Sequence, residues 1–471
     1  MRMKKNIGGF FCALFLALSS VVTAYGAEQD GKDPAGNISL YAAAAVLMDA
    51  DSGRVLYGKS ADTPMAMAST TKIMTCIQIL EHADPDETLT VSAYAASMPK
   101  VKLYIKQGEE YRVGDLLYSL MLESHNDTAV ALAEHVGRKY LPEELREKPV
   151  SEFTVEESKM AVAAFAALMN AKAAELGCEN TWFITPNGLD ATETITLQDG
   201  STVQKEHCTT AAELARIMAY CIGESPQKEA FLRITRAENY SFSANGRSFS
   251  CYNHNAFLSM MDGALSGKTG FTNKAGYCYV GALERDGRTF VVSLLACGWP
   301  NNKTYKWSDT RELMEYGLEH YSYKSFLDEG TRFDEKLLQP IPVLNGRTDI
   351  LGTTAYTGIE VAGRRDNEQD GAASRNDPET AGMGGTDTPA DRTDGERPGL
   401  LLREDEQIRV EYDWSKSLEA PVEQGTTVGS IRYIVDDRVY LREDIVTTQN
   451  VERIEFDWCL EQVLGRFLIR K

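Results

Sequence analysis

The stretch Gly276-Tyr277-Cys278-Tyr279-Val280 opens an apolar run that ends at Leu283, and a second apolar run extends from Thr289 to Leu295. The turn Arg285-Asp286-Gly287 separates the two runs. Two short apolar runs joined by a tight turn that contains glycine predict a β-hairpin. We therefore expect this segment to supply two neighbouring antiparallel strands of a sheet.

A second hairpin is expected near the start of the chain, because Ala43–Asp49 and Gly53–Tyr57 flank the turn Asp51-Ser52-Gly53. Between the hairpins, and again after the second one, apolar residues recur at helical spacing. The expected helices are Ser69–Glu81, Val113–Leu122, Asp127–Val136, Val155–Leu176, Thr209–Ile222 and Ser308–Tyr321. Hairpins around a run of helices predict an α+β domain over residues 38–323, with an antiparallel sheet packed against helices instead of a doubly wound parallel sheet.

After Leu327 the sequence changes to short strand-like runs, which predict a second, all-β domain over residues 330–455. Its expected strands are Lys336–Val343, Thr354–Val361, Gln407–Tyr412, Thr427–Val435 and Val439–Val446. Inside this domain, residues 363–399 contain no aromatic residue and no Leu, Ile or Val. A segment of this composition buries little apolar surface, so we expect a disordered insertion.

The last residues, 456–471, have an amphipathic pattern that ends in Arg470-Lys471. The apolar side consists of Phe456, Leu460, Val463, Leu464 and Phe467. A helix of this kind with basic residues at its end lies well in a membrane interface. A helix that docks on the β-domain has the same pattern, so the residues alone leave both interpretations open.

The N-terminus has the pattern of an export signal. Basic residues in Met1-Arg2-Met3-Lys4-Lys5 precede the apolar run Ile7–Val22, and small residues follow at Ala24 and Gly26. The apolar run is shorter than the roughly 20 residues that a membrane span needs. We therefore expect residues 1–26 to be a cleaved signal peptide and the mature protein to work outside the cytoplasm.

Composition narrows the function classes. The 471 residues have a net charge of −20 at pH 7, which repels phosphate backbones and argues against nucleic acid as a partner. Eight of the nine cysteines remain after cleavage, and in a chain of this length buried thiols are favoured over a disulfide framework. The sequence has no Cys-x-x-Cys pair and no His-Glu-x-x-His helix, so no metal cofactor is expected.

Two short motifs lie at helix boundaries. Ser69-Thr70-Thr71-Lys72 begins an expected helix, where residues three apart share a face and the Lys72 amine can reach the Ser69 hydroxyl. Taken alone it is also compatible with an N-cap serine and a solvated lysine. Ser124-His125-Asn126 falls in the break between two expected helices, and it too could simply cap the helix that follows.

A third motif, Lys268-Thr269-Gly270, follows Ser266-Gly267 and precedes the strand that begins at Gly276. Its glycine allows a backbone to approach a ligand closely, although a turn with an exposed lysine has the same sequence. The three motifs S-x-x-K, S-x-N and K-T-G occur here in the order used by penicillin-recognising serine enzymes. Three coincidences in that order are improbable.

The chain resembles the low-molecular-mass penicillin-binding proteins that are D-alanyl-D-alanine carboxypeptidases, serine peptidase family S11, of the Gram-positive sporulation and vegetative type. The resemblance covers nearly the whole chain. Beyond the three motifs it rests on Leu47–Gly53, Met67–Lys72, Asn126-Asp127 with Ala129–His135, Thr185–Asp190, and Lys268–Thr272 with Ala275–Tyr277. It implies a β-lactamase/transpeptidase-like domain, a C-terminal β-domain, and a terminal helix that holds the enzyme on the outer face of the cytoplasmic membrane.

The resemblance also implies acyl transfer in two steps on peptidoglycan stem peptides that end in D-Ala-D-Ala, with β-lactams as inhibitors and no cofactor. Ser69 would be the nucleophile, Lys72 its base, and Ser124 a proton relay to the leaving amine. The substrate-binding residues would be Asn126, Lys268, Thr269, Gly270, Phe271 and Lys306. The backbone N–H groups of Ser69 and Phe271 would form the oxyanion hole.

The sequence departs from the family pattern at Lys306, where family members commonly have an arginine that helps to hold the substrate carboxylate. Lysine is a point charge and not a bidentate fork. Two alternatives share the three motifs: a β-lactamase, and a sensor that is acylated by β-lactams. The common β-lactamase class uses a glutamate in an E-x-x-L-N string, and no such string lies between Lys139 and Asp190.

Overall fold

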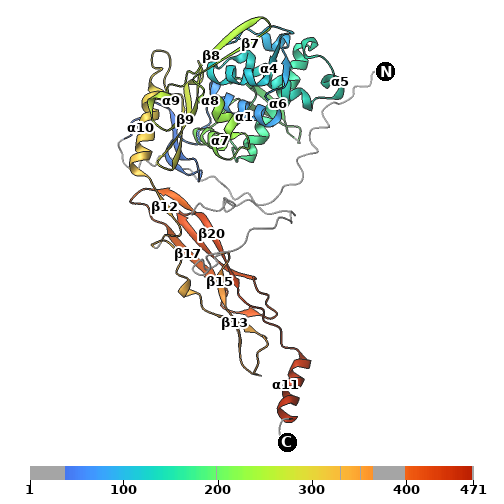
Figure 1. Ribbon diagram of the computed structural model, residues 1–471, viewed down its shortest axis with the longest axis vertical. Helices are drawn as coiled ribbons and strands as arrows, with labels where there is room; N and C mark the ends of the chain where they lie inside the picture. The colour runs from blue at the N-terminus through green and yellow to red at the C-terminus, as the bar shows by residue number, and fades with distance from the viewer. Residues whose placement is uncertain (1–37, 198, 329, 351, 364–397, 469–471) are drawn as a thin grey trace. The chain divides into compact units, whose positions relative to one another are not determined.

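The computed structural model describes residues 38–197, 199–328, 330–350, 352–363 and 398–468 (Figure 1). The chain separates into two compact units that divide between Met314 and Glu315. Each unit has its own hydrophobic core. The predicted signal peptide and residues 364–397 of the predicted insertion lie outside the described residues.

The first unit contains one five-stranded sheet with the strand order β2-β1-β11-β10-β9 and antiparallel pairing throughout. Its strands are β1 (Ala44–Asp49), β2 (Val55–Lys59), β9 (Ala264–Thr272), β10 (Gly276–Arg285) and β11 (Arg288–Leu295). Both predicted hairpins are present, as β1 with β2 and β10 with β11. Every residue of β1 is buried, because β1 is flanked by strands and both sheet faces are covered. Strand β9 takes an edge, so half of its backbone hydrogen-bonding groups have no neighbouring strand.

Helices pack around this sheet, and α7 lies against β1, β10 and β11. The helices of the first unit, with α10 at its end, are α1 (Lys72–His82), α2 (Ala93–Ala96), α3 (Val113–Tyr118), α4 (Asn126–Gly137), α5 (Glu143–Arg146), α6 (Val155–Glu175), α7 (Ala211–Gly223), α8 (Lys228–Arg236), α9 (Phe257–Met260) and α10 (Tyr305–His320). The predicted α+β class with an antiparallel sheet is therefore confirmed.

Two predicted helices are not α-helical over their whole length, and the irregular turns lie next to the Ser69 and Ser124 motifs. The helix expected from Ser69 starts as the 3-10 turn η2 (Ala68–Thr71) and becomes α-helical only at Lys72. The Thr70 and Thr71 hydroxyls donate to the carbonyls of residues three positions earlier, which tightens this turn. The helix expected over Val113–Leu122 ends after α3 in the π-turn η3 (Ser119–Glu123).

Three small two-stranded hairpins in the first unit were not expected from the sequence. They pair β3 (Thr88–Thr90) with β4 (Glu110–Arg112), β5 (Thr192–Thr196) with β6 (Thr202–Glu206), and β7 (Asn239–Ala244) with β8 (Arg247–Tyr252). Their residues are mostly polar, and most positions of β5 and β6 are exposed. The strands of the first two hairpins lack a continuous apolar run, whereas β7 and β8 alternate apolar and polar residues around the turn Asn245-Gly246, a hairpin signal that the sequence analysis missed.

The second unit is built of short strands, as predicted. They are β12 (Ser322–Ser325), β13 (Ile341–Leu344), β14 (Ala355–Thr357), β15 (Ile359–Val361), β16 (Gly399–Leu402), β17 (Arg409–Trp414), β18 (Leu418–Glu419), β19 (Thr427–Val435) and β20 (Arg438–Thr447). They form sheets β15-β20-β19-β17 and β14-β13-β18 and the pair β12-β16. The helix α11 (Phe456–Leu468) follows the last strand.

Glycine 137 provides a test of the packing that positions the first unit's helices. A Cβ atom at Gly137, the last residue of α4, would lie 1.9 Å from the Ala161 carbonyl oxygen of α6. We expect Gly137→Ala to lower the free energy of unfolding by about 1–3 kcal/mol, measured from guanidinium titration of the mature protein, because the two helices must separate.

Gly223→Ala is the matched control. Gly223 ends α7, and a Cβ atom there would meet no atom within 4 Å. Its substitution should leave stability unchanged or raise it by up to about 1 kcal/mol. Equal unfolding midpoints for Gly137→Ala and the wild-type protein would contradict this account of the helix contact.

Candidate active site

The Ser69 hydroxyl lies on the 3-10 turn η2, one turn before Lys72 at the start of α1. Lys72 Nζ is 2.9 Å from Ser69 Oγ. The turn is fixed from one side by the loop at Gly188, where a Cβ atom would lie 1.9 Å from the Ala68 carbonyl oxygen. Because only glycine fits there with its φ of +82°, the loop holds the backbone of the serine turn at contact distance.

Lys72 has three polar neighbours and no exposure to solvent. Its Nζ donates to the Asn187 carbonyl at 2.6 Å and to Asn126 Oδ1 at 3.0 Å, besides its contact with Ser69 Oγ. The first two oxygens can only accept hydrogen bonds, whereas a hydroxyl can also donate. A neutral amine has two N–H donors and one lone pair. In that form Lys72 would satisfy both carbonyl oxygens and keep its lone pair for the Ser69 hydroxyl, which itself donates to the Asn187 carbonyl at 3.4 Å.

The electrostatics of the site favour that neutral form. Burial lowers the pKa of Lys72 well below its usual value, the Lys268 ammonium lowers it further, and only the Asp127 carboxylate opposes the shift. Burial also lowers the pKa of Lys268, to about 7. Burial and the charge of the neighbouring lysine thus both favour a neutral amine at Lys72.

Asn126 begins α4 and is buried. Its Nδ2 donates to the carbonyls of Pro99 and Lys100 at 3.3 and 3.2 Å, which leaves Oδ1 turned to Lys72. The next residue, Asp127, accepts three backbone N–H groups from Leu103 to Ile105 and so ties that loop to the helix start. Asn126 thus helps to position the Lys72 amine, a contact that the sequence analysis did not predict.

Ser124 lies two residues before Asn126 and follows the π-turn η3 in a left-handed conformation, with φ of +63°. His125 Nδ1 bonds to Ser119 Oγ at 2.8 Å, and Ser119 Oγ lies 3.0 Å from Thr128 Oγ1, which fixes this loop. Within the described part of the chain, the Ser124 hydroxyl has no hydrogen-bond partner and makes none with Lys72. The structure places it on the loop beside Asn126, with its hydroxyl available.

The K-T-G motif lies on the edge strand β9, next to the serine turn. A Cβ atom at Gly270 would lie 2.8 Å from the Ser69 backbone nitrogen, so glycine permits the strand to reach the serine. Lys268 is buried, and its Nζ donates to the Thr269 carbonyl at 3.0 Å. Phe271 is 39% exposed and its ring contacts Tyr277 on β10.

Lys306, near the start of α10, is turned into the protein. Its Nζ donates to the Lys303 carbonyl at 2.6 Å and lies 4.8 Å from the centres of the Tyr277 and Trp307 rings. Burial lowers its pKa. Its contacts reach the site indirectly, through Tyr277, which contacts Phe271, and through Trp307, which contacts Tyr279 opposite Thr269. The structure therefore places five predicted residues around the serine turn, Ser69, Lys72, Asn126, Lys268 and Gly270. Lys306 lies further from that turn, behind aromatic rings.

Sequence reasoning assigned no role to Asn187, although its carbonyl accepts the shortest hydrogen bond of Lys72. The loop is anchored by Thr75, whose hydroxyl donates to the Pro186 carbonyl at 2.6 Å. It is also tied through buried His207, which bonds Thr71 Oγ1 at 2.8 Å and accepts the Ile184 N–H at 3.0 Å. The sequence Pro186-Asn187-Gly188 is typical of a tight turn, but it does not indicate that this turn packs against the Ser69 turn.

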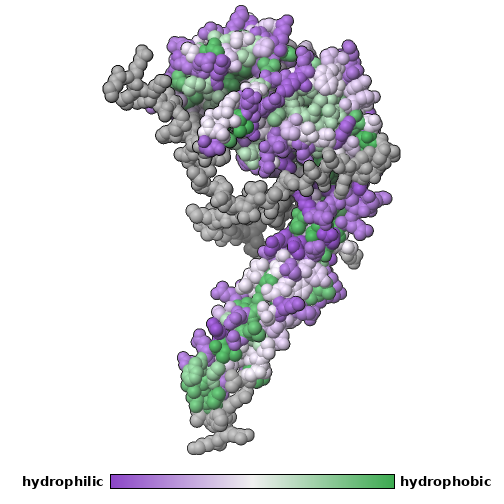
Figure 2. Space-filling view, turned by 180° about the vertical axis from the view of Figure 1, so that it is seen from behind, coloured by the Kyte–Doolittle hydropathy of each residue, from purple (hydrophilic) through white to green (hydrophobic). Residues whose placement is uncertain are grey.

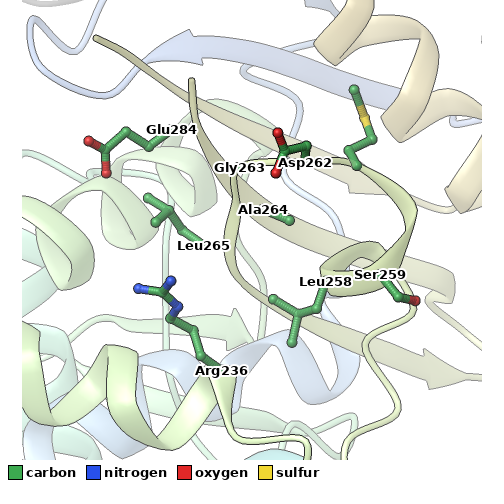
Figure 3. Close-up of a pocket in the computed structure, with 9 residues that line it drawn as sticks. Arg236, Leu258, Ser259, Asp262, Gly263, Ala264, Leu265 and Glu284 are labelled. Carbon is green, nitrogen blue, oxygen red and sulfur yellow. The ribbon is translucent and has the colours of Figure 1, made fainter. Parts of the chain in front are cut away.

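A pocket of about 690 Å³ lies at the other end of β9, away from Ser69 and Lys72 (Figure 3). Arg236, Ser259, Asp262 and Glu284 supply its polar side chains. Among the described residues, none of the residues that line this pocket belongs to the three motifs. The chemistry of the candidate site is therefore separate from this pocket.

Comparison with known proteins agrees with this geometry. A family model described as D-alanyl-D-alanine carboxypeptidase, peptidase S11, matches residues 29–140 and 159–296, more than half of the chain. A model of the penicillin-binding protein 5 C-terminal domain matches residues 402–453. The D-alanyl-D-alanine carboxypeptidase DacF of Bacillus subtilis is 22% identical over 445 residues, 93% of each chain.

Two solved structures show the same fold. The D-alanyl-D-alanine carboxypeptidase DacD of Francisella tularensis has a TM-score of 0.56 at 20% identity and covers 95% of this chain and 100% of its own. Penicillin-binding protein 5 of Haemophilus influenzae has a TM-score of 0.57 at 19% identity, and the match covers 88% of this chain and 99% of that protein's chain. With the family model matched across its sheet, helices and serine turn, this chain belongs to the D-alanyl-D-alanine carboxypeptidases of the peptidase S11 family.

Proposed function

We propose that the protein removes the terminal D-alanine from peptidoglycan stem peptides through an acyl-enzyme on Ser69. The observation that supports this most directly is the 2.9 Å contact between Lys72 Nζ and Ser69 Oγ. Lys72 and the neighbouring Lys268 are both buried, and burial lowers the pKa of each. A serine is a weak nucleophile until a base takes its proton. Here the base is a lysine whose neutral form is stabilised by burial and by a neighbouring cation.

In the first step, neutral Lys72 accepts the Ser69 proton while Oγ bonds to the carbonyl carbon between the two D-alanines. The N–H groups of Ser69 and Phe271 donate to the oxyanion that forms. Collapse of this tetrahedral intermediate breaks the C–N bond and leaves an ester on Ser69. The leaving nitrogen takes a proton through the free hydroxyl of Ser124, and D-alanine departs.

In the second step a water molecule loses a proton to Lys72 and attacks the ester carbonyl. The ester C–O bond breaks, Ser69 regains its proton, and the shortened peptide leaves. A β-lactam acylates the same serine by opening its ring, so no group leaves the site. The alternatives, a β-lactamase and a β-lactam sensor, differ from a carboxypeptidase in whether the peptide acylates the serine and in how fast each ester is hydrolysed.

Substrate binding is proposed to use the edge of β9. The terminal carboxylate of the peptide would pair with the Lys268 ammonium and the Thr269 hydroxyl, and this pairing raises the proton affinity of Lys268. The peptide backbone would add to the open side of β9, where backbone groups have no neighbouring strand. Lys306 would support this site indirectly by packing beneath Tyr277.

The export signal and the terminal helix suggest where the enzyme works. We propose an extracytoplasmic protein held on the outer face of the cytoplasmic membrane by α11. Phe456 is 78% exposed and Leu464 47%, whereas Trp458 is buried with Arg347 over its ring. Figure 2 shows apolar surface gathered at the end of the second unit, over α11. The proposed contact is interfacial and is made by the exposed apolar side chains of α11. Among the described helices there is no candidate membrane span.

The proposed activity predicts that purified mature protein releases D-alanine from an acetylated Lys-D-Ala-D-Ala peptide and that Ser69→Ala releases none. Loss of the nucleophile should reduce turnover by at least about a thousandfold. Ser243→Ala should retain wild-type turnover, because Ser243 is an exposed residue of β7 whose hydroxyl bonds to the Ser248 hydroxyl, away from the three motifs. The measurement is a coupled assay of free D-alanine.

The alternatives give different results in the same assay. Acylation of Ser69 by penicillin without D-alanine release would support the sensor, and rapid penicillin hydrolysis without D-alanine release would support the β-lactamase. Full D-alanine release by Ser69→Ala would contradict the proposed nucleophile.

The interfacial helix predicts that deletion of residues 456–471 abolishes binding to anionic lipid vesicles and leaves D-alanine release intact. The reason is that the exposed apolar side chains of α11 supply the membrane contact, while the site lies wholly in the first unit. Vesicle sedimentation measures the first effect. The double variant Phe456→Ser with Leu464→Ser should weaken binding without truncation, and a truncated protein that still sediments would contradict the proposal.

A further inference from the structure

The direction of a bound peptide along β9 follows from two contacts of the site, and this inference rests on the proposed function. The terminal carboxylate belongs at Lys268, and the scissile carbonyl belongs where the Ser69 backbone reaches Gly270. The peptide therefore runs from its C-terminus at Lys268 toward its N-terminal part at Thr272. The residue that precedes the two D-alanines would lie beside Thr272, the last residue of β9.

A carboxylate is fixed at that position. Thr272 Oγ1 donates to Asp190 Oδ1 at 3.2 Å and accepts the Ala275 N–H at 3.0 Å. Asp190 itself is exposed, and in the described part of the chain its second oxygen makes no hydrogen bond. Asp190 lies two residues after Gly188, in the loop whose Asn187 carbonyl accepts a hydrogen bond from Lys72, and this contact anchors the loop at the site.

The nearby cation does not cancel this charge. Lys274 pairs with Glu206 on β6 at 2.7 Å, and this hydrogen bond is the main cause of the raised Lys274 pKa, with smaller contributions from the charges of Glu206 and Asp190. Two carboxylates and one ammonium leave this corner of the site with a net negative charge. Glu193 on β5 accepts a hydrogen bond from Trp182 Nε1–H at 2.6 Å, so this carboxylate is already engaged within the protein.

We propose that Asp190 is a specificity-determining residue that recognises a free ammonium group on the side chain of the substrate residue before D-Ala-D-Ala. The recognised chemistry is a peptide whose antepenultimate residue is a diamino acid with an uncapped side-chain amine. Acylation of that amine removes its charge, so Asp190 distinguishes a free side chain from a capped one. Thr272 acts as a positioning residue, because its hydroxyl holds the carboxylate in place.

The test compares two peptides that differ by one acetyl group. Nα-acetyl-Lys-D-Ala-D-Ala has a free ε-amine, and Nα,Nε-diacetyl-Lys-D-Ala-D-Ala has none. We expect the wild-type protein to prefer the free amine in kcat/KM by roughly two- to fivefold at low salt, the effect of an exposed ion pair, with the preference falling as salt rises. Asp190→Asn should bring the ratio to about one, and Thr272→Val should lower it.

Asp199→Asn is the matched control, because Asp199 is an exposed carboxylate at the turn of the β5–β6 hairpin, where it accepts hydrogen bonds from Ser201. Its ratio should equal that of the wild-type protein. The ratio is measured within one preparation, so partial misfolding of a variant cancels. A wild-type ratio of one, or an unchanged ratio in Asp190→Asn, would overturn the inference, whereas failure to release D-alanine from either peptide would instead overturn the proposed function.

Discussion

The rest of the site depends on the burial of one amine. Lys72 has no solvent to accept its hydrogen bonds, and its neighbours are two carbonyl oxygens and one hydroxyl. A neutral amine fits this set, with its two N–H groups on the carbonyl oxygens and its lone pair toward the hydroxyl, and burial disfavours the charged form. Burying a charge is costly, so the desolvation that lowers the pKa of Lys72 also favours the form of the amine that the proposed mechanism needs beside Ser69.

Three separate segments of the chain surround Lys72: the start of α4, the Gly188 loop and the strand β9. The start of α4 supplies Asn126, whose amide orientation is set by the Pro99 and Lys100 carbonyls. The Gly188 loop supplies a backbone carbonyl, and β9 supplies the second lysine. At Gly188 and Gly270 a side chain would collide with the serine turn. These two glycines therefore set how close the loop and the strand approach the nucleophile.

Much of the fold could be predicted because apolar periodicity reports burial. The strands around Gly276 and Thr289 are buried on both faces and read as continuous apolar runs, so their hairpin was found from sequence. The polar hairpin β5–β6 lies outside the core, and no such signal marks it. The three motifs located Ser69, Lys72 and Lys268, but the backbone carbonyl of Asn187 could not be found, since any residue can supply a carbonyl. The link between Thr272 and Asp190 joins positions 82 residues apart, a distance that no local pattern spans.

The central claim is that Lys72 acts as a neutral base beside a charged Lys268, and the pH dependence of acylation tests it most directly. The second-order rate constant for acylation of the mature protein by benzylpenicillin reports the free enzyme. The account predicts a bell-shaped profile. Its rising limb, deprotonation of Lys72, should lie far below the ordinary lysine value of about 10.5. Its falling limb should follow loss of the Lys268 proton, whose pKa is about 7 before the ligand carboxylate binds. A rate that keeps rising until pH 10 or above would mean that Lys72 is charged at neutral pH, and would contradict the account.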